Sequence, residues 1–315
     1  MNKIGAFFKL VRWPNLLITA LTMCLVYHCV MHMGSTWMFT LMVISMVLIQ
    51  AGGYVINDIF DKDIDMVNKP EKLIVDKIFT ERQCKLFYIV LTVMGLACAL
   101  VGSIMALGMS FLTIFAFMVL LACLLYTYSS RYKKELVIGN LIVSLSVAFA
   151  VFLPWIFQML YISKHELLLI TLRPLMQYSI HIVLIYTVFA FLMTFIREIV
   201  KDMEDVEGDK RQHCHTIPIA WGMNAAQIIV IILCFLTSYV ILRAANYLND
   251  TFGFVNTYYM LIASGVLLFG FVLIGNVYSL ISDKSLRTEK QFHIQSIALK
   301  ISMLVGVLSM FFIKC

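Results

Sequence analysis

Residues 41–65 read LMVISMVLIQAGGYVINDIFDKDID, an apolar run that ends in a cluster of acidic residues. Apolar runs of about 20 residues recur along the chain, and a helix of about 20 residues spans the ~30 Å hydrocarbon core of a bilayer. Of the 315 residues, 62% are hydrophobic and only 13% are charged, whereas soluble domains carry roughly 25% charged residues. The sequence therefore predicts an all-α, polytopic membrane protein and argues against a water-soluble fold.

Nine transmembrane helices are expected, within one transmembrane domain that covers residues 1–315. Their approximate positions are 15–33, 36–56, 84–108, 110–128, 136–158, 177–200, 221–245, 255–281 and 291–313.

The basic residues indicate an orientation, because most Lys and Arg residues fall in alternate connections between the expected helices. Those segments are 1–14, 57–83, 129–135, 201–220 and 282–290. Loops rich in Lys and Arg stay in the cytoplasm. We therefore expect a multi-pass protein of the inner (cytoplasmic) membrane, with the N-terminus in the cytoplasm and the C-terminus on the opposite side. The net charge of +6 then suits anionic lipid and gives no case for nucleic acid as a partner.

The acidic end of residues 41–65 places several oxygen atoms on one helical face. Residues at i, i+1, i+4 and i+8 share a face of an α-helix, and this spacing is followed by Asn57, Asp58, Asp61 and Asp65. Like charges this close repel, so the cluster needs a compensating cation. Mg²⁺ prefers such oxygen ligands and completes its shell with water and substrate phosphates. The alternative, a solvated acidic loop, is disfavoured because charge near a membrane-embedded helix end is costly and usually functional.

A second acidic cluster lies at the corresponding place in the other half of the chain. Asp202, Asp205 and Asp209 follow i, i+3 and i+7, which is again one helical face. Two such clusters are what a diphosphate held through two or three Mg²⁺ ions would require.

A third feature combines hydroxyl and basic side chains, from Tyr128 to Lys134, with Gly139-Asn140 downstream. A Lys binds phosphate as a point charge, and a Tyr hydroxyl can donate to the same oxygens. Taken alone, this segment also fits an ordinary basic cytoplasmic loop.

Together these motifs resemble the UbiA-type membrane prenyltransferase superfamily, in order and over essentially the whole chain. The resemblance rests on Asn57-Asp58-x-x-Asp61-x-x-x-Asp65, Tyr128-Ser129-x-x-Tyr132-Lys133, Gly139-Asn140, Asp202-x-x-Asp205-x-x-x-Asp209 and the start Arg12-Trp13-Pro14-Asn15. It implies nine helices around a central cavity, with cytoplasmic Asp-rich cap loops that hold Mg²⁺ and diphosphate. It also implies a lateral opening to lipid for the prenyl tail.

The resemblance implies roles for individual residues. Lys133, Tyr128 and Arg197 would bind the diphosphate, and Asp61, Asp202 and Lys133 would be catalytic. The metal ligands would be Asn57, Asp61, Asp202 and Asp205, with Asp58, Asp65 and Asp209 as further members.

The chain departs from the family pattern after the first acidic motif. An Arg-Pro-containing stretch is usual there, whereas this chain reads Asn68-Lys69-Pro70-Glu71-Lys72. Lys72 would replace the Arg as a substrate ligand, although Arg and Lys are not equivalent at bidentate phosphate contacts. The departure bears on how the substrate is bound more than on the class of reaction.

The expected reaction transfers a prenyl group from a prenyl diphosphate to a lipophilic acceptor, with Mg²⁺ assisting departure of diphosphate. The acidic and Tyr128 motifs look most like the branch of geranylgeranylglyceryl phosphate geranylgeranyltransferases, so a prenylglyceryl phosphate is the expected acceptor. An aromatic acid, as in quinone biosynthesis, is the alternative acceptor.

A cation-coupled membrane transporter is the alternative from another functional class. Transporters usually place a charged site near the bilayer midplane, whereas both acidic clusters fall at expected helix ends. The expected partners are the two substrates and membrane lipid, and no obligate protein partner is evident.

Overall fold

The computed structural model describes residues 2–30, 35–68, 73–107, 111–164, 166–281 and 289–313. Within these ranges the chain is helical almost throughout, and an isolated bridge between Val75 and Phe79 is the one pairing of extended residues. The prediction of an all-α protein is confirmed.

Nine helical segments in the described ranges are long and apolar enough to cross a membrane. An apolar run in lipid becomes helical because its backbone polar groups must be satisfied within the segment. Each expected span overlaps one of these segments. Their bounds are Trp13–Leu25 (α2) with Val26–Val30 (π-helix η1), Thr36–Phe60 (α3), Glu81–Leu107 (α5), Phe111–Ser130 (α6), Ile138–Ile162 (α7), Arg173–Glu204 (α9), Met223–Phe252 (α12), Val255–Leu267 (α13) with Leu268–Leu273 (π-helix η4) and Ile274–Ile281 (α14), and Glu289–Leu308 (α15) with Ser309–Phe312 (η6).

The two Asp-rich segments, expected as loops, are mostly helical. The first continues from α3 into α4 (Lys62–Asn68), and the second runs from the end of α9 into α10 (Val206–Arg211). Both short helices carry two acidic residues in their first turn, where negative charge interacts favourably with the helix dipole. The remaining short helices are α1 (Lys3–Leu10), η3 (Tyr132–Lys134), α8 (Glu166–Thr171) and α11 (Ile217–Ala220).

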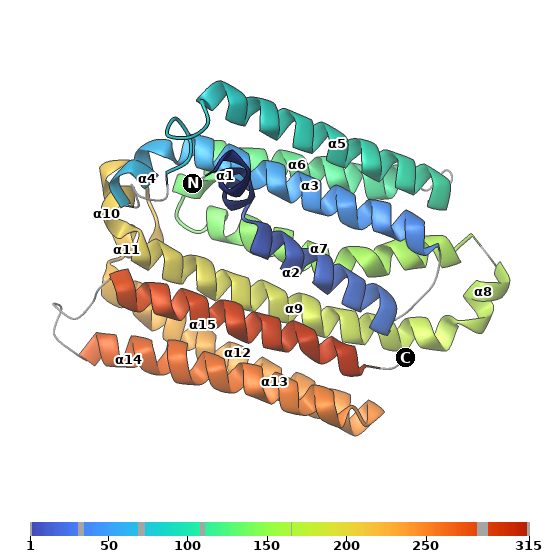
Figure 1. The fold of residues 1–315 in the computed structure, drawn as a ribbon. Coiled ribbons are helices and arrows are strands. Elements are labelled where there is room, and N and C mark those ends of the chain that lie inside the picture. Colours follow the sequence, from blue (N-terminus) through green and yellow to red (C-terminus); the bar gives the residue numbers. More distant parts are fainter. Residues whose placement is uncertain are drawn as a thin grey trace. The chain divides into compact units, whose positions relative to one another are not determined.

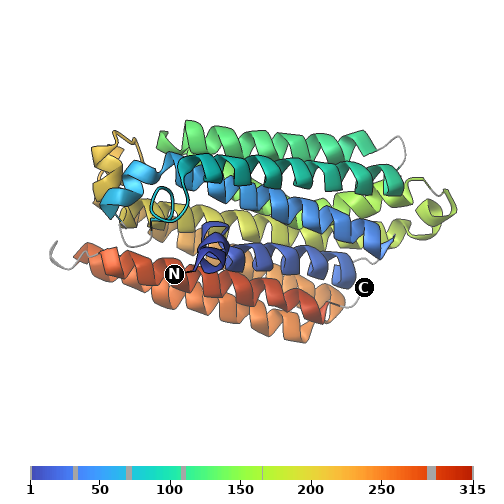
Figure 2. The same cartoon turned by 45° about the horizontal axis from the view of Figure 1, so that its top comes forward.

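The described chain falls into two compact units, of which the first comprises Met1–Lys133 and Phe152–Tyr178. In this unit α3 packs against α5 and α6, and α2 packs against α3 (Figures 1 and 2). The close approach of α3 and α5 depends on Gly95, since a Cβ there would lie 3.1 Å from the Ser45 carbonyl oxygen. Small residues allow helices in a membrane to pack closely in this way.

The second unit comprises Lys134–Val151 and Ser179–Cys315. In this unit α13 packs against α12 and α15. On α15, Gly306 faces the ring of Phe189 on α9, and a Cβ at position 306 would lie 2.3 Å from that ring. The helices α7 and α9 each run from one unit into the other. A single domain over residues 1–315 and a central cavity both stay predictions.

Candidate functional site

The acidic cluster of the first unit lies at the junction of α3 and α4, where the helical hydrogen-bond pattern continues. The Asp61 N–H donates to the Asn57 carbonyl at 2.8 Å, and the Asp65 N–H donates to the Asp61 carbonyl at 2.8 Å. Asp61 itself has αR-region backbone angles. The junction therefore keeps Asn57, Asp61 and Asp65 on one face, as their spacing predicts.

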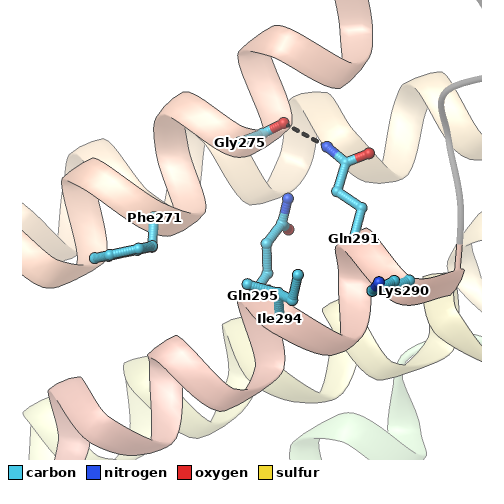
Figure 3. A pocket seen from close by; sticks show the side chains of 6 residues that line it. All are labelled: Phe271, Gly275, Lys290, Gln291, Ile294 and Gln295. Carbon is cyan, nitrogen blue, oxygen red and sulfur yellow. Dashed lines mark hydrogen bonds between the residues drawn. The ribbon is translucent and has the colours of Figure 1, made fainter.

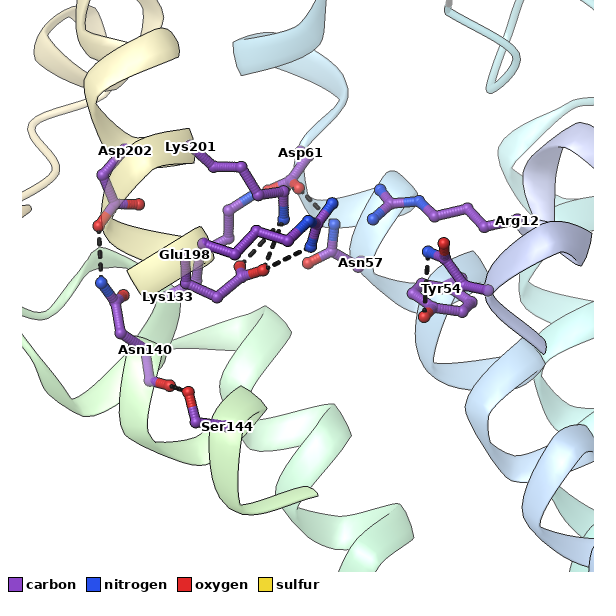
Figure 4. A network of polar contacts seen from close by, with 12 residues as sticks. Arg12, Tyr54, Asn57, Asp61, Lys133, Asn140, Ser144, Glu198, Lys201 and Asp202 are labelled. Atoms are coloured by element: carbon purple, nitrogen blue, oxygen red, sulfur yellow. Dashed lines mark hydrogen bonds and ion pairs between the residues drawn. The ribbon is translucent and has the colours of Figure 1, made fainter. Parts of the chain in front are cut away.

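Asp61 is the most buried acidic residue of this cluster, with 4% of its surface exposed. Its Oδ2 accepts hydrogen bonds from the Asn57 side-chain amide and from the Lys133 ammonium (Figure 4). Lys133 lies in η3, 72 residues along the chain. The structure thus joins the first acidic motif to the basic motif that follows α6.

Asn57 has one side-chain atom without a partner. The residue is 7% exposed, and its Oδ1 is buried with no hydrogen-bond partner among the described residues. Leaving a buried acceptor unsatisfied costs about 1–3 kcal/mol. Beside a carboxylate, such an oxygen suits a hard cation.

Asp58 has a different partner, Arg12, whose guanidinium donates to Asp58 Oδ1 at 2.8 Å. Arg12 joins α1 to α2 and has a left-handed backbone with φ 51°. Its guanidinium lies 5.0 Å from the centre of the Tyr54 ring, and the Tyr54 hydroxyl accepts from the Asn15 amide at 3.3 Å. The start of α2 is therefore tied to the acidic end of α3.

Asp65 is half-buried near the same charges. Burial, and then the neighbouring Asp61 carboxylate, raise the pKa of Asp65 to about 6, with Lys133 acting in the opposite direction. A cation bound beside Asp65 would stabilise the charged form of its carboxyl group.

The second unit contains the other acidic cluster, at the end of α9. The Asp205 N–H donates to the Lys201 carbonyl at 2.9 Å, and the Asp209 N–H donates to the Asp205 carbonyl at 3.1 Å. The helical pattern therefore continues from α9 into α10. Asp209 is 6% exposed, and Asp205 is half-buried at the start of α10.

Asp202 is oriented by Asn140. The Asn140 amide donates to Asp202 Oδ2 at 2.9 Å, and the Asn140 carbonyl accepts from the Ser144 hydroxyl at 2.6 Å (Figure 4). Asn140 lies near the start of α7 and is 8% exposed. It fixes one oxygen of the carboxylate through a neutral hydrogen bond.

Glu198, one turn before Asp202, accepts from two cations. The Arg197 guanidinium donates to Glu198 at 3.0 Å, and the Lys201 ammonium donates to both carboxylate oxygens at 3.0 Å. The Arg197 Nε is buried and has no hydrogen-bond partner among the described residues. Further along α9, Glu204 lies 3.0 Å from the His293 ring of α15.

Several expected site residues are thus in contact within their own unit, namely Asn57, Asp61 and Lys133. Asp58 pairs with Arg12 instead, and Arg197 pairs with Glu198. Tyr128 is half-buried near the end of α6. Lys72 and Lys69 lie outside the described residues.

Sequence reasoning did not assign the partners Arg12, Asn140 and Glu198. For Glu198 the spacing does indicate a partner, because Lys201 follows three residues later on the same helical face. Asn140 stood in a motif that the family resemblance included, but nothing in the sequence pointed to Asp202 as its partner.

No group of three His, Cys, Asp or Glu side chains in the described part of the chain could hold a metal ion by itself. Mg²⁺ usually takes only one or two protein carboxylates and completes its shell with water and substrate phosphates. Asp61 together with the unpartnered Asn57 oxygen fits that requirement, so the residues present suit Mg²⁺ bound jointly with a phosphorylated substrate.

Comparison with known proteins gives a family match. The model of the UbiA prenyltransferase family matches residues 13–300. A digeranylgeranylglyceryl phosphate synthase of Sulfolobus acidocaldarius is 30% identical over 236 residues, covering 73% of this chain and 74% of the relative. The corresponding synthase of Sulfurisphaera tokodaii is 29% identical over 276 residues, with 86% of each chain covered.

Solved structures share the fold. A structure described as giving insights into digeranylgeranylglyceryl phosphate synthase in membranes has a TM-score of 0.65 at 23% identity, covering 98% of both chains. A UbiA homolog from Archaeoglobus fulgidus bound to GPP and Mg²⁺ has a TM-score of 0.63 at 17% identity, covering 96% of this chain and 99% of that chain.

Proposed function

The chain belongs to the UbiA prenyltransferase family, and we propose that it transfers a prenyl group from a prenyl diphosphate to a prenylglyceryl phosphate. The observation that carries the acceptor class is the likeness, over most of both chains, to relatives named digeranylgeranylglyceryl phosphate synthase. The transporter alternative is not supported, since the family to which the chain belongs is one of prenyltransferases.

Asn57 and Asp61 are our first choice of Mg²⁺ ligands in the first unit. The support is the buried, unpartnered Asn57 Oδ1 beside the Asp61 carboxylate. Asp58 and Asp65 are further members, and Arg12 holds Asp58 in place. In the second unit we assign Asp202 and Asp205, with Asp209 as a further member.

Each unit contributes one cation that we assign as a diphosphate ligand. Lys133 already contacts a carboxylate of the first cluster, and a Lys held there can exchange that carboxylate for a phosphate oxygen. Arg197 has a buried Nε donor without a partner, which a phosphate oxygen would satisfy. Tyr128 and Lys72 complete the set of proposed substrate ligands.

In the proposed reaction the bond between the first prenyl carbon and the diphosphate oxygen breaks, and diphosphate leaves with the electron pair. The acceptor hydroxyl oxygen bonds to that carbon and gives its proton to the released diphosphate or to water. Mg²⁺, when bound, neutralises negative charge on the leaving diphosphate. Lys133 and Arg197 stabilise the same charge through fixed donors, while Asn140 and Asn57 hold the acidic side chains in position.

We also propose that the protein lies in the inner (cytoplasmic) membrane and that the two acidic helix ends face the cytoplasm. The support is the concentration of Lys and Arg in the connections on that side. Labelling single cysteines introduced at exposed Lys210 and at exposed Asp250, in a variant without the eight native cysteines and in sealed inverted vesicles, tests this orientation. Only the cysteine at 210 should react with a reagent that does not cross the membrane.

A panel assay tests the function. Purified protein receives labelled prenyl diphosphates of several chain lengths with a prenylglyceryl phosphate or with several aromatic acids, and mass spectrometry identifies the products. We expect Mg²⁺-dependent release of diphosphate and prenylation of the glyceryl phosphate. Efficient prenylation of an aromatic acid alone would replace the acceptor and keep the reaction class. Failure to release diphosphate with every acceptor, in protein that remains folded, would reject the reaction.

A further inference from the structure

A cavity in the second unit lies where α14 and the π-helix η4 face the start of α15. Its volume is about 300 Å³. Figure 3 shows the six residues that line it, which are Phe271, Gly275, Lys290, Gln291, Ile294 and Gln295. None of these residues has been given a role in prenyl transfer.

The hydrogen bonds around this cavity fix how the Gln295 amide is turned. Asn276 donates through Nδ2 to the Val272 carbonyl at 2.7 Å, and a carbonyl can only accept, so the nitrogen of Asn276 must face it. The same nitrogen lies 2.8 Å from Gln295. The Gln295 atom at that contact is therefore its oxygen, and its nitrogen occupies the other side of the amide.

That nitrogen, Gln295 Nε2, is a buried donor without an acceptor in the described protein. Gln295 is 2% exposed, and Nε2 has no hydrogen-bond partner. Figure 3 shows its side chain pointing from α15 toward α14, beside Gly275. A Cβ at position 275 would lie 2.8 Å from Nε2, so the absence of a side chain at Gly275 leaves room there.

A buried donor in this position calls for an acceptor oxygen. Leaving it unsatisfied destabilises the folded protein. One water molecule would satisfy it, but the cavity volume of about 300 Å³ is about ten times the ~30 Å³ that a water occupies in the liquid. The space is also at the lower end of the range for ligand pockets, ~300–1,000 Å³.

The remaining walls have two kinds of chemistry. Lys290 supplies a positive charge at the first turn of α15, whereas Phe271 and Ile294 are 55% and 50% exposed apolar side chains. Lys290 begins one candidate membrane span, and the preceding span ends at Ile281. The cavity therefore extends from the level of a span's end, where lipid head groups lie, toward the apolar part of the span.

From this arrangement we infer that the cavity between α14 and α15 binds an anionic lipid, in which a glycerol-linked phosphate has no positive charge beside it in the head group. The phosphate pairs with Lys290, an oxygen of the glycerol region accepts from Gln295 Nε2, and the apolar chain lies against Phe271 and Ile294. The ligand can be a membrane phospholipid or the proposed glyceryl phosphate acceptor, which share this chemistry.

The binding test uses the full-length protein in detergent after removal of bound lipid. Native mass spectrometry measures binding of phosphatidylglycerol, and phosphatidylcholine serves as the zwitterionic comparison. Thermal stability is followed with the same lipids and with inorganic phosphate. We expect one saturable phosphatidylglycerol site that raises the melting temperature, with weaker binding of phosphatidylcholine and no shift from inorganic phosphate. Equal effects of the two lipids, or an equal shift from inorganic phosphate, would overturn the inference.

Two variants locate the site. Lys290→Gln removes the charge, and Gln295→Met removes the donor at similar size, so each should weaken phosphatidylglycerol binding by about fivefold. Arg243→Gln removes an exposed positive charge on α12 of the same unit and should leave the affinity unchanged. Unchanged affinity in both cavity variants places the lipid elsewhere and rejects the assignment.

A third measurement does not depend on the folding of the Gln295 variant. A photo-crosslinking residue replaces Ile294, or Ile297 as an exposed control on the same helix, in vesicles of equal phosphatidylglycerol and phosphatidylcholine. Position 294 should capture phosphatidylglycerol in excess over position 297; equal ratios would count against the site.

Kinetics of the transfer reaction distinguish the two ligands, the glyceryl phosphate acceptor and a membrane phospholipid. A raised KM for the glyceryl phosphate in Lys290→Gln would identify the ligand as the acceptor. An unchanged KM, with phosphatidylglycerol binding lost, would identify it as a membrane phospholipid. The binding measurements need no turnover, so they stand even if the proposed reaction fails.

Discussion

Replacing Asp61 by Asn tests the proposed role of this carboxylate in catalysis separately from its contribution to the fold. The substitution keeps the size of the side chain and an oxygen that can accept from Lys133, so it removes little except the charge. The ion pair it weakens joins a side chain that is 5% exposed to one that is 28% exposed. Because Asn keeps an acceptor for Lys133 and the Lys133 side chain is partly exposed to water, weakening this pair costs about 1 kcal/mol.

The expected effect on transfer is much larger. If Asp61 is a metal ligand that helps to stabilise the leaving diphosphate, its neutralisation should lower kcat about 10²–10³-fold, in line with loss of one group that stabilises a transition-state charge. That factor corresponds to about 3–4 kcal/mol of activation free energy. The melting temperature should fall by only about 2–4 °C, as expected for a loss of 1 kcal/mol in a large domain.

The assay measures initial rates of diphosphate release at several Mg²⁺ concentrations, together with thermal unfolding of the same preparations. Asp76→Asn is the matched control, because Asp76 also pairs with a Lys of the first unit, Lys62, but is 39% exposed. Its rate should stay within about twofold of the unmodified protein. If Asp61→Asn retains more than a tenth of the rate while folded, Asp61 is not an essential metal ligand.

Three further outcomes follow from the same geometry. Asp202→Asn should lower the rate of transfer by at least 10², as seen in product yield; a near-normal yield would remove α9 from the metal site. Lys133→Ala should raise the KM for prenyl diphosphate about tenfold and leave the acceptor KM unchanged; equal effects on both would reject its assignment. Because the pKa of Asp65 is raised to about 6, protonation should compete with Mg²⁺ below pH 6; a Mg²⁺ requirement that does not rise between pH 7.5 and 5.5, or rises equally in Asp65→Asn, contradicts this.

The spans and the local acidic faces could be predicted from sequence because they depend on neighbouring residues. Asn57 and Asp61 are four residues apart, so a helix brings them together wherever it lies. The sequence analysis missed that both helices continue past their expected ends, because acidic residues after an apolar run are typical of loops. It left out that acidic residues in the first turns of α4 and α10 interact favourably with the helix dipole.

Contacts between distant segments could not be predicted in the same way. Arg12 and Asp58 are 46 residues apart, and Asn140 and Asp202 are 62 apart. Each of these partners is one of several polar residues at helix ends, and only the packing of helices decides which pair meets. The partner of Asp61 is a similar case, because sequence put Lys133 in the site as a phosphate ligand and gave no reason for its contact with a carboxylate.

The left-handed turn at Arg12 bears on how the beginning of the chain can be altered. A non-glycine residue in this conformation costs about 1–2 kcal/mol, and here it joins α1, whose Ala6 and Leu10 are buried, to a guanidinium that holds Asp58. Without α1, the backbone at Arg12 could leave the left-handed conformation. The Arg12 guanidinium would then no longer be held against Asp58 at the acidic end of α3. If the acidic end of α3 holds Mg²⁺ as proposed, a protein shortened at its amino end should bind Mg²⁺ more weakly. A fall in activity after such a deletion would then not by itself show that a metal ligand had been lost.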